Sequence, residues 1–416
     1  MLKGFFKLTP PERVFEIIDT FAPLQGEEIP IEDSLGRVLS RDIYSPSHMP
    51  GFPRATMDGY AVRSRDTFGA SPHLPAILEL KGEVRMGEIP KMRIGKGEAV
   101  KIATGGMLPK GADGVVMIEF SHMLDDSTIE IEKAISPFEN VMQPDDDIKR
   151  GELVLEKGRR LRPPDIGALA GLGIQCVSVY KRPRIAIIST GDEVIPIEKE
   201  PSPGQVRDIN RYTLSCFCTA VGACPIFLGI CPDDFSALKE LVERGMEIAD
   251  SVWISGGSSV GTRDMTLKVF ESMQGFELLV HGIAIRPGKP TIIGQVGSKP
   301  VVGLPGQVSS AFIVAEIFMS RIIKRLSGED PSDIVPYIEA KMTRNMESSP
   351  GREDYIRVRL LKEGDDILAD PIIGKSGLIS PLIQADGLVR IEMNREGVYE
   401  GEKVKVIPFI SKGALW

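Results

Sequence analysis

A loop of small residues after an apolar run is the first place where this sequence could carry chemistry. The segment SVWISGGSSVGTRD begins as a β-type run and opens into glycine and serine. Glycine lets the backbone approach a ligand without a Cβ, and hydroxyl groups add hydrogen bonds, so the loop suits phosphate or another oxyanion. Its final acid, Asp264, would instead contact a metal, a hydroxyl or an amine. A tight strand-to-helix connection without a ligand is the alternative for this loop alone. The small residues assigned to the site are Ser255, Gly256, Gly257 and Ser258.

Three further segments in the same part of the chain have a similar character. STGDE at 189–193 and GLPG at 303–306 each follow an apolar run, and RPGKP at 286–290 places two cations on a proline-rich turn. Neutral small residues could cradle a phosphate ester, the cations could neutralise it, and the acids could hold a metal or a polar head group. Turn formation explains any one of these segments. Four of them together favour a small anion or a nucleotide-like ligand.

Outside this region the polar residues give weaker signals. Asp58 precedes a glycine and Tyr60, and an Asp-Gly turn is the simpler interpretation. The glycine loop that begins at Thr104 and Gly105 is typical of a hairpin connection. The run of acids at 145–147 is typical of a solvated face, although it could also hold a cation.

Composition and missing motifs argue against several functions. The sequence has no GxGxxG after the first strand of the glycine-rich region, no Walker lysine motif and no nucleophile elbow. A formal charge of -8 argues against a surface that coats nucleic acid. Five cysteines without a CxxC pair, and only four histidines, argue against a zinc cluster and favour reduced thiols. Because no apolar run has spanning length and the start lacks a signal-peptide cleavage site, we expect a cytoplasmic protein without a membrane partner.

Alternating strands and helices must position the glycine-rich loops. This alternation predicts a mostly parallel sheet with helices on both faces, and its ligand crevice lies at the carboxyl ends of the strands. The expected strands are residues 184–189, 225–230, 252–255, 276–280 and 301–304. The expected helices are residues 211–221, 235–249, 265–273 and 308–326.

The 416 residues are too many for one ordinary core, so we predict a multidomain architecture of the α/β plus β class. Short β runs between turns predict a small, mainly β domain at 49–145 and a C-terminal β-barrel at 329–416. The central three-layer, parallel-sheet domain takes residues 178–328. An N-terminal helical and extended linker domain is formed by 1–48 together with 146–177.

Seven motifs, spread over essentially the whole chain, occur in a specific order. They are PRATMDGYAVR from Pro53, TGGMLPKGADGVVMIE from Thr104, STGDE from Ser189, GQVRDINRYTL from Gly204, SGGSSVGTRD from Ser255, RPGKP from Arg286 and GLPG from Gly303. Their combination resembles the molybdopterin molybdenumtransferase family, which is related to the gephyrin E domain. The resemblance implies an elongated, four-part subunit that forms a homodimer and whose parallel-sheet domain binds molybdopterin.

The resemblance also implies an activity. Adenylylated molybdopterin and molybdate, or tungstate, would be converted to molybdenum cofactor with release of AMP, assisted by Mg²⁺. Partners would be the molybdopterin adenylyltransferase that supplies the substrate and the enzymes that receive the cofactor, with no nucleic acid involved.

Site residues follow from the resemblance position by position. The catalytic acids would be Asp58, Asp147 (or Asp146), Glu193, Asp233 and Asp264. Asp233 and Asp264 would hold the metal. Because Asp58 is distant in sequence from the parallel-sheet domain, the resemblance implies an active site that the partner subunit completes. Substrate contacts would come from Thr104, Gly105, Ser189, Thr190, Gly191, Ser255, Gly256, Gly257, Ser258, Arg286, Lys289, Pro305 and Gly306.

Two positions depart from the family pattern. The basic motif begins with Arg286 where the family has lysine, which keeps the charge and changes its geometry. Gln307 and Val308 stand where the family has Asn-Pro, so a fixed φ angle is missing beside the expected oxyanion pocket. Selection of tungstate, and a non-catalytic role as a molybdopterin or cofactor carrier, are therefore open alternatives to the transferase.

Overall fold

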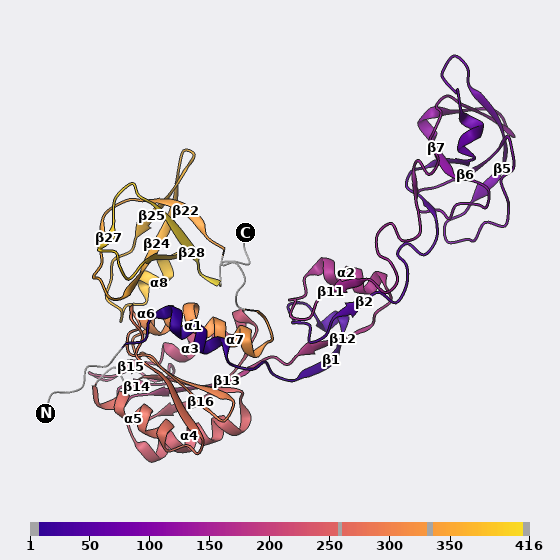
Figure 1. The fold of residues 1–416 in the computed structure, drawn as a ribbon. Helices are drawn as coiled ribbons and strands as arrows, with labels where there is room; N and C mark the ends of the chain where they lie inside the picture. The colour runs from indigo at the N-terminus through magenta and orange to yellow at the C-terminus, as the bar shows by residue number, and fades with distance from the viewer. Residues whose placement is uncertain (1–7, 257–259, 331–335, 411–416) are drawn as a thin grey trace.

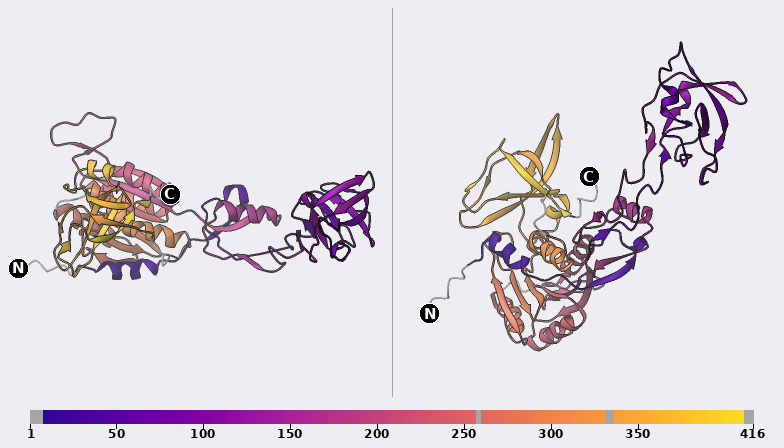
Figure 2. Two further views of the ribbon diagram at one scale, coloured as in Figure 1. Left: turned by 90° about the horizontal axis from the view of Figure 1, so that it is seen from above. Right: turned by 45° about the vertical axis from the view of Figure 1, so that its right-hand side comes forward.

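The chain folds into four structural units arranged along an elongated body (Figure 1). The computed structural model describes residues 8–256, 260–330 and 336–410. An α/β unit and a C-terminal barrel lie together at one end, a small β unit lies at the other, and a linker unit lies between them (Figures 1 and 2). None of the helices formed by the described residues is both long and apolar enough to cross a membrane.

The α/β unit contains a six-stranded, mostly parallel sheet, which confirms the predicted central fold. Its strands, in spatial order, are β16 (Cys224–Cys231), β13 (Arg184–Thr190), β17 (Ser251–Gly256), β21 (Lys299–Leu304), β20 (Ile292–Val296) and β18 (Phe276–His281). The first four run parallel, while β20 and β18 are antiparallel to their neighbours. The strand β20 was not expected from the sequence. A minor pair, β14 (Val194–Ile195) and β15 (Val206–Arg207), lies beside the sheet.

Helices cover both faces of this sheet, as the alternation of strands and helices predicts. They are α3 (Asn210–Val221), α4 (Phe235–Ile248), α5 (Val260–Glu271), α6 (Val308–Val314) and α7 (Ser320–Leu326), with the π-helical segment η4 (Ala315–Met319) between the last two. Along β13, Ile185 and Ile187 pack with α3, α6 and α7, whereas Ala186 and Ile188 pack with α4 and α5. Successive side chains of a strand point to opposite faces, and a strand buried on both faces is therefore apolar throughout.

The N-terminal helix α1 (Pro11–Asp19) also belongs to the core of the α/β unit, although we had placed it with the linker domain. Its Val14 and Ile18 are fully buried in the core that contains α3 and α7. Asp19 forms an ion pair with Arg321 of α7. The apolar stripe of a nine-residue helix needs a partner surface, and α7 with η4 supplies it.

The linker unit is made from two distant stretches of chain. Strand β1 (Gly26–Pro30) pairs with β12 (Cys176–Tyr180), and β2 (Ile43–Tyr44) pairs with β11 (Leu153–Leu155). Helix α2 (Pro163–Gly171) and the short 3-10 helix η1 (Ile31–Asp33) cover them. The chain thus leaves the linker unit, forms the small β unit and returns.

The small β unit has one six-stranded sheet, in the order β7-β4-β6-β5-β9-β8. Its pairings are antiparallel except for β5 with β6. The strands are β4 (Gly59–Val62), β5 (Ala76–Val84), β6 (Glu98–Ile102), β7 (Gly114–Met117), β8 (Ser121–Asp125) and β9 (Thr128–Ile131). A short pair, β3 (Arg54–Ala55) with β10 (Val141–Met142), joins the unit to the linker, and the 3-10 helices are η2 (Ser64–Thr67) and η3 (Ile118–Phe120).

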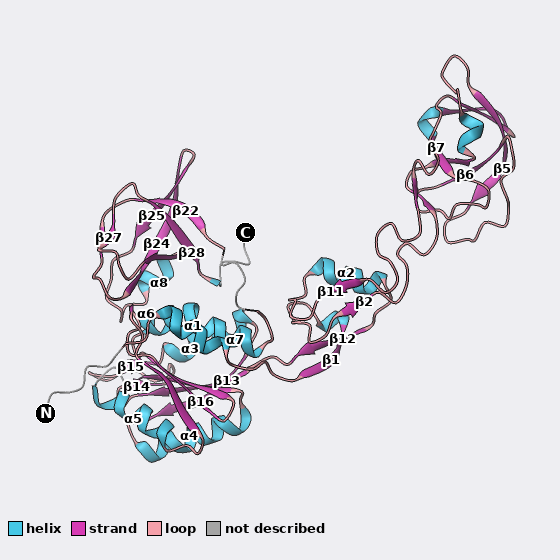
Figure 3. Cartoon of the chain, viewed as in Figure 1, coloured by secondary structure: helices cyan, strands magenta, loops and turns pink. Residues whose placement is uncertain are grey.

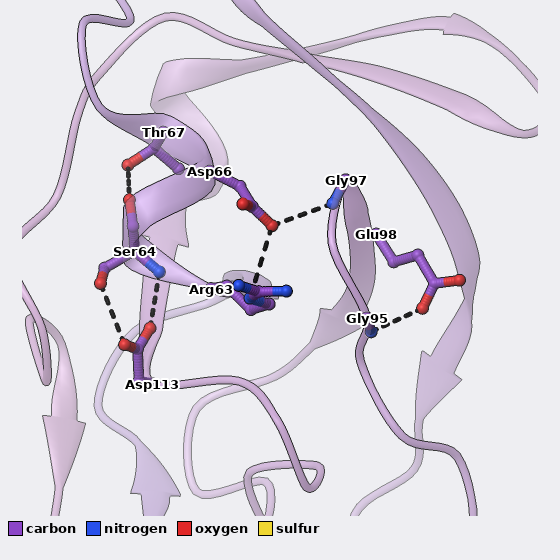
Figure 4. A network of polar contacts seen from close by, with 8 residues as sticks. All are labelled: Arg63, Ser64, Asp66, Thr67, Gly95, Gly97, Glu98 and Asp113. Atoms are coloured by element: carbon purple, nitrogen blue, oxygen red, sulfur yellow. Dashed lines mark hydrogen bonds and ion pairs between the residues drawn. The ribbon is translucent and has the colours of Figure 1, made fainter.

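A polar network fixes the turns of this small unit (Figure 4). The Asp113 carboxylate accepts hydrogen bonds from the amide and the hydroxyl of Ser64 at the start of η2. Asp66 accepts from the Gly97 amide at 2.9 Å and lies 3.7 Å from the Arg63 guanidinium. Carboxylates that accept from backbone amides satisfy donors left over at turns, so this network has a structural role.

The C-terminal unit is a β-barrel, as predicted, and five strands close it. It packs beside the α/β unit (Figures 1 and 3). The order is β24-β25-β22-β28-β26, and pairing of β26 with β24 closes it. These strands are β22 (Ile338–Met342), β24 (Glu353–Glu363), β25 (Asp366–Pro371), β26 (Gly387–Ile391) and β28 (Lys403–Pro408). Helix α8 (Ser380–Gln384) and the pair β23 (Met346–Glu347) with β27 (Gly397–Val398) complete the unit. A strand of the α/β unit, β19 (Ile285–Arg286), pairs with the start of β24 and joins the barrel to the α/β unit.

Candidate functional site

Two buried serine hydroxyls mark the carboxyl ends of the parallel strands. Ser189 of β13 and Ser255 of β17 are neighbours in the sheet register, and each is 2% exposed. Neither Oγ atom has a hydrogen-bond partner among the described residues. A buried hydroxyl without a partner costs free energy, so two adjacent ones indicate a place where a ligand supplies the missing hydrogen bonds.

The next residues along these strands bring two chain segments into close contact. Thr190 pairs with Gly256, and a Cβ added to Gly256 would lie 2.1 Å from the Thr190 Oγ1 atom. Gly256 also has a φ angle of +151°, which favours glycine. Gly191 has φ +138°, and a Cβ there would lie 2.6 Å from the Glu193 carboxylate. The close packing and the positive φ angles at the strand ends therefore favour glycine at both positions, in addition to any turn that it forms.

Three acids gather beside these hydroxyls, after strands β13 and β16. The Asp233 amide donates a hydrogen bond of 3.0 Å to the Asp192 carboxylate. Although the Asp233 side chain reaches solvent, partial desolvation raises its pKa, and the nearby charges of Asp192 and Glu193 raise it further. Like-charged neighbours disfavour ionisation, so a cation at this point would stabilise all three carboxylates.

A cavity of about 360 Å³ lies beside the strand ends and carries positive charge. The RPGKP segment lines it through Arg286 and Lys289, and the loop after β21 lines it through Pro305 and Gly306. Of the described residues that line the cavity, three are cations and none is an acid. A small pocket with this lining suits a tetrahedral oxyanion.

Two residues of the C-terminal unit complete this cavity and were missed by the sequence analysis. Arg352, just before β24, is its third cation, and Ser376 follows the barrel strand β25. Ser376 reaches this position because its carbonyl oxygen accepts a hydrogen bond from the Ser309 amide of α6. Nothing in the local pattern around either residue predicted a site, because both lie in a unit whose sequence indicated only short strands and turns.

A second missed pair lies at the start of α3, within the motif GQVRDINRYTL. The Asn210 side-chain amide donates a hydrogen bond of 2.9 Å to the Gly306 carbonyl and so ties α3 to the loop after β21. The Asn210 Oδ1 and Asp208 Oδ2 atoms are buried without a hydrogen-bond partner among the described residues. These orphaned oxygens are acceptors, so they complement the hydroxyl donors of Ser189 and Ser255.

A separate polar group lies in the small β unit. The Asp58 carboxylate accepts hydrogen bonds from the Thr104 amide at 2.7 Å and from its hydroxyl at 2.8 Å, and both lower the pKa of Asp58. The prediction that the Thr104 loop is a hairpin connection is wrong. The loop joins β6 to β7, and β4 lies between these two strands in the sheet. Gly59 opens β4 and must be glycine, since a Cβ there would overlap the Val116 carbonyl oxygen. Gly105 adjoins this group, and a Cβ there would meet the Met86 side chain.

The acidic run at 145–147 forms part of an exposed loop around an open hollow. Asp147 is exposed, and its amide donates to the Met49 carbonyl where the chain passes between the small β unit and the linker unit. Asp146 accepts from the Gln143 amide and thereby closes its own turn. In this position Asp147 lies next to neither the serine hydroxyls nor the cationic cavity of the same chain.

Three of the expected residues cannot be placed by their side chains. Gly257 and Ser258 lie outside the described residues, and Asp264 is described only as part of the α5 backbone. In the described part of the chain, no group of three or more histidine, cysteine or acidic side chains is arranged to hold a metal ion.

The expected site residues therefore form two groups, which lie at opposite ends of the elongated molecule. Ser189, Glu193, Asp233 and the cationic cavity belong to the end formed by the α/β unit and the barrel, whereas Asp58 with Thr104 belongs to the other end (Figures 1 and 2). The linker unit separates them, so a single chain of this shape does not bring them together.

Comparison with known families gives matches along most of the chain. Residues 9–173 match "MoeA N-terminal region (domain I and II)". Residues 186–325 match "Probable molybdopterin binding domain", and residues 339–409 match "MoeA C-terminal region (domain IV)". The three matches follow one another in the order of the units described above.

Individual relatives cover nearly the whole chain. A Methanocaldococcus jannaschii protein named for molybdopterin biosynthesis is 36% identical and covers 98% of each chain. The molybdopterin molybdenumtransferase of Haemophilus influenzae is 31% identical over 93% of this chain and 95% of its own length. The solved structure of a molybdopterin biosynthesis MoeA protein from Pyrococcus horikoshii is 40% identical, covers 97% of this chain and 99% of its own, and has a TM-score of 0.81.

Proposed function

The chain belongs to the MoeA family of molybdopterin molybdenumtransferases, enzymes of molybdenum cofactor biosynthesis, and from this premise we propose that it inserts molybdenum or tungsten into adenylylated molybdopterin with release of AMP. The observation that carries this proposal is the acid-free, three-cation cavity next to a pair of unpartnered serine hydroxyls. The cationic cavity suits a tetrahedral dianion, and the pair of serine hydroxyls suits a phosphate ester.

The oxyanion would occupy the cationic cavity. Arg286, Lys289 and Arg352 supply positive charge from two structural units, and Ser310 of α6 adds a hydroxyl. Guanidinium groups bind tetrahedral oxyanions through paired N–H donors, and lysine adds a compact charge. Binding in this cavity would hold molybdate or tungstate at the edge of the strand-end crevice, next to the place proposed for molybdopterin.

The phosphate-bearing substrate would bind across the strand ends. The hydroxyls of Ser189 and Ser255 would donate hydrogen bonds to phosphate oxygens, and the oxygens of Asp208 and Asn210 would accept from hydroxyl or amino groups of the ligand. Gly256 lets the backbone approach without a Cβ. This is the crevice position in which open α/β sheets bind their ligands.

Magnesium is compatible with the acids of this crevice. It is usually held by one or two carboxylates together with phosphate oxygens and water, so a preformed cage of three protein ligands is not required. Asp233 and Asp264, the metal ligands that the resemblance implies, would hold the ion, with Glu193 close to Asp233. Desolvation raises the pKa of Asp233, and the charges of Asp192 and Glu193 raise it further, a repulsion that a cation would relieve. When bound, the ion would neutralise phosphate charge as the anhydride bond to AMP breaks.

A second copy of the chain would complete the site. Because Asp58 and Thr104 lie at the far end of the elongated chain, they can approach a strand-end crevice only if that crevice belongs to another subunit. A two-fold dimer places each small β unit against the partner's α/β unit, and this gives two equivalent shared sites. We place this homodimer in the cytoplasm, between the adenylyltransferase that makes its substrate and the enzymes that receive the cofactor.

The altered loop after β21 keeps the helix geometry that a proline would provide. Helix α6 begins at Val308, with Gln307 as its N-cap residue at φ −74°. Proline is favoured at the first helical position because the amide there has no helical acceptor, and valine can occupy the same place. The Gln307-Val308 pair therefore does not by itself favour the alternative of a non-catalytic carrier.

Single-turnover release of AMP tests this function. Full-length protein would be mixed with adenylylated molybdopterin, with Mg²⁺ or a chelator, and with molybdate, tungstate or no oxyanion. We expect release only with Mg²⁺ and an oxyanion, and loss of release in Glu193→Gln but not in Glu198→Gln, an exposed acid of the adjoining loop. Tight binding without release under every condition would reject the transferase in favour of the carrier.

A further inference from the structure

We propose that Asp354 is a positioning residue of the oxyanion cavity. This buried carboxylate of the barrel holds the guanidinium groups of Arg286 and Arg352, which come from two structural units, at the rim of the cavity. The inference rests on the proposed function, since it gives Asp354 a role in selecting the oxyanion.

Strand pairing brings the three residues together. In the parallel pair of β19 and β24, Arg286 lies opposite Asp354, and the Glu353 amide donates to the Ala284 carbonyl at 2.9 Å. Arg352 lies in the bend just before β24, two residues before Asp354, and its guanidinium donates a hydrogen bond to that carboxylate. The backbone connection between the α/β unit and the barrel therefore also carries the charged groups of the cavity.

Each oxygen of the carboxylate faces a different guanidinium. The Arg352 Nε atom lies 3.0 Å from Asp354 Oδ1, and an Arg286 terminal nitrogen lies 3.5 Å from Oδ2. Asp354 is 1% exposed, whereas the side chains of Arg286 and Arg352 are 62% and 35% exposed. The acid is thus fixed in the protein, and the cations extend from it toward the cavity.

The burial of Asp354 constrains both its carboxylate and the two arginine side chains that pair with it. A buried carboxylate is stable only when it is paired, and Oδ2 has no closer partner among the described residues than Arg286. In return, the carboxylate removes much of the rotational freedom of two long side chains before any ligand binds. Prior orientation of this kind strengthens binding because less entropy is lost on association.

The carboxylate also sets the charge that an anion meets. Arg286, Lys289 and Arg352 give the cavity three positive charges, and the negative charge of Asp354, directly behind two of them, lowers the net charge to two. Two net charges match a divalent tetrahedral oxyanion such as molybdate or tungstate. Without Asp354 the two guanidiniums would repel each other, and the mostly exposed Arg286 would turn toward solvent.

The test replaces the carboxylate by an amide of the same shape. In Asp354→Asn the amide can still accept from Arg352 through its oxygen, but its NH₂ group faces Arg286 and repels it. We expect the KM for molybdate in AMP release, and the Kd for tungstate in equilibrium dialysis, to rise about tenfold, because Arg286 loses the ion pair that orients it. The kcat at saturating molybdate is expected to stay unchanged.

A matched control comes from the same barrel. Asp370 contacts the Arg344 guanidinium at 3.1 Å and the Thr343 hydroxyl, away from the cavity. Asp370→Asn removes an acid of the same unit and should leave KM, Kd and kcat at their wild-type values. Thermal unfolding of both variants would separate loss of fold from loss of affinity, and the smaller Asp354→Ser serves if the asparagine variant does not fold.

A double-mutant cycle distinguishes positioning from a purely structural tie. If Asp354 acts by orienting Arg286, replacing Asp354 by asparagine should have little further effect on the tungstate Kd in an Arg286→Ala background. An unchanged Kd in Asp354→Asn, or a fall in kcat and unfolding temperature with KM unaltered, would refute the proposal. Wild-type protein that binds tungstate but releases no AMP would instead reject the transferase function and leave the dialysis result for Asp354 interpretable.

Discussion

Glu316 offers a quantitative test of how burial controls stability in this fold. It lies in the π-helical segment η4, directly after the helix that lines the oxyanion cavity, and is 9% exposed. One carboxylate oxygen accepts a hydrogen bond of 3.0 Å from the Ile410 amide, just after the barrel. The other has no hydrogen-bond partner among the described residues. Desolvation raises the pKa of Glu316 from 4.5 to about 7.

The direction of the pH effect follows from this shift. Between about pH 4.5 and 7 the native protein holds a proton on Glu316 that the unfolded chain releases, so the free energy of unfolding falls as the pH rises through this window. Above the native pKa the penalty is complete, and for a shift of this size it amounts to about 3 kcal/mol. Glutamine cannot ionise, so Glu316→Gln lacks the penalty at every pH.

The measurement is urea unfolding of wild type and Glu316→Gln at pH 5 and pH 8, followed by tryptophan fluorescence, to which Trp253 in the α/β core contributes. We expect the variant to gain about 2 to 3 kcal/mol relative to wild type between the two pH values. The exposed Glu347→Gln serves as control and should show no such gain. An equal difference between Glu316→Gln and wild type at both pH values would refute the assignment of a buried, protonated carboxyl group.

Three further predictions concern the site. Gly256→Ala should destabilise the protein by about 3 kcal/mol or more in denaturant unfolding, since the new Cβ would lie 2.1 Å from the Thr190 hydroxyl; wild-type stability would contradict the strand-end geometry. Asp58→Ala and Glu193→Ala should each abolish AMP release when tested alone. When the two variants are unfolded together and refolded in equal amounts, about a quarter of wild-type activity should return, because half of the dimers then carry one intact shared site of two. No recovery in demonstrably mixed dimers would contradict a shared site. Arg352→Ala should raise the KM for molybdate about tenfold or more, and an unchanged KM would remove the barrel from the oxyanion cavity.

The fold class was predictable because its signals are local. The alternation of apolar runs with amphipathic helices between 184 and 326 indicated a mostly parallel sheet, and the structure confirms it. Short strands separated by turns likewise indicated the small β unit and the C-terminal barrel. The position of the strand-end loops then follows from topology, since parallel strands bring their carboxyl ends to one edge of the sheet.

The antiparallel edge of the sheet and the partner of the first helix were not predictable in the same way. Strand β20 is short, and its residues gave no clear periodicity within a segment of glycine and proline turns. Helix α1 shows an amphipathic pattern, but a pattern states only that one face needs covering. Its burial against α7, more than 300 residues further along the chain, is a result of tertiary packing.

The sequence by itself determined which residue types could bind an oxyanion and which strands would carry them. Only the tertiary structure decided that Arg352 and Ser376 of the C-terminal unit join Arg286 and Lys289 around one cavity, with Asp354 paired to two of these cations. It also decided that the small β unit, which contains Asp58, lies at the opposite end of the molecule from the units that line that cavity. Periodicity and turn chemistry depend on neighbours a few residues away, whereas the pairing of β19 with β24 depends on the packing of whole units against each other.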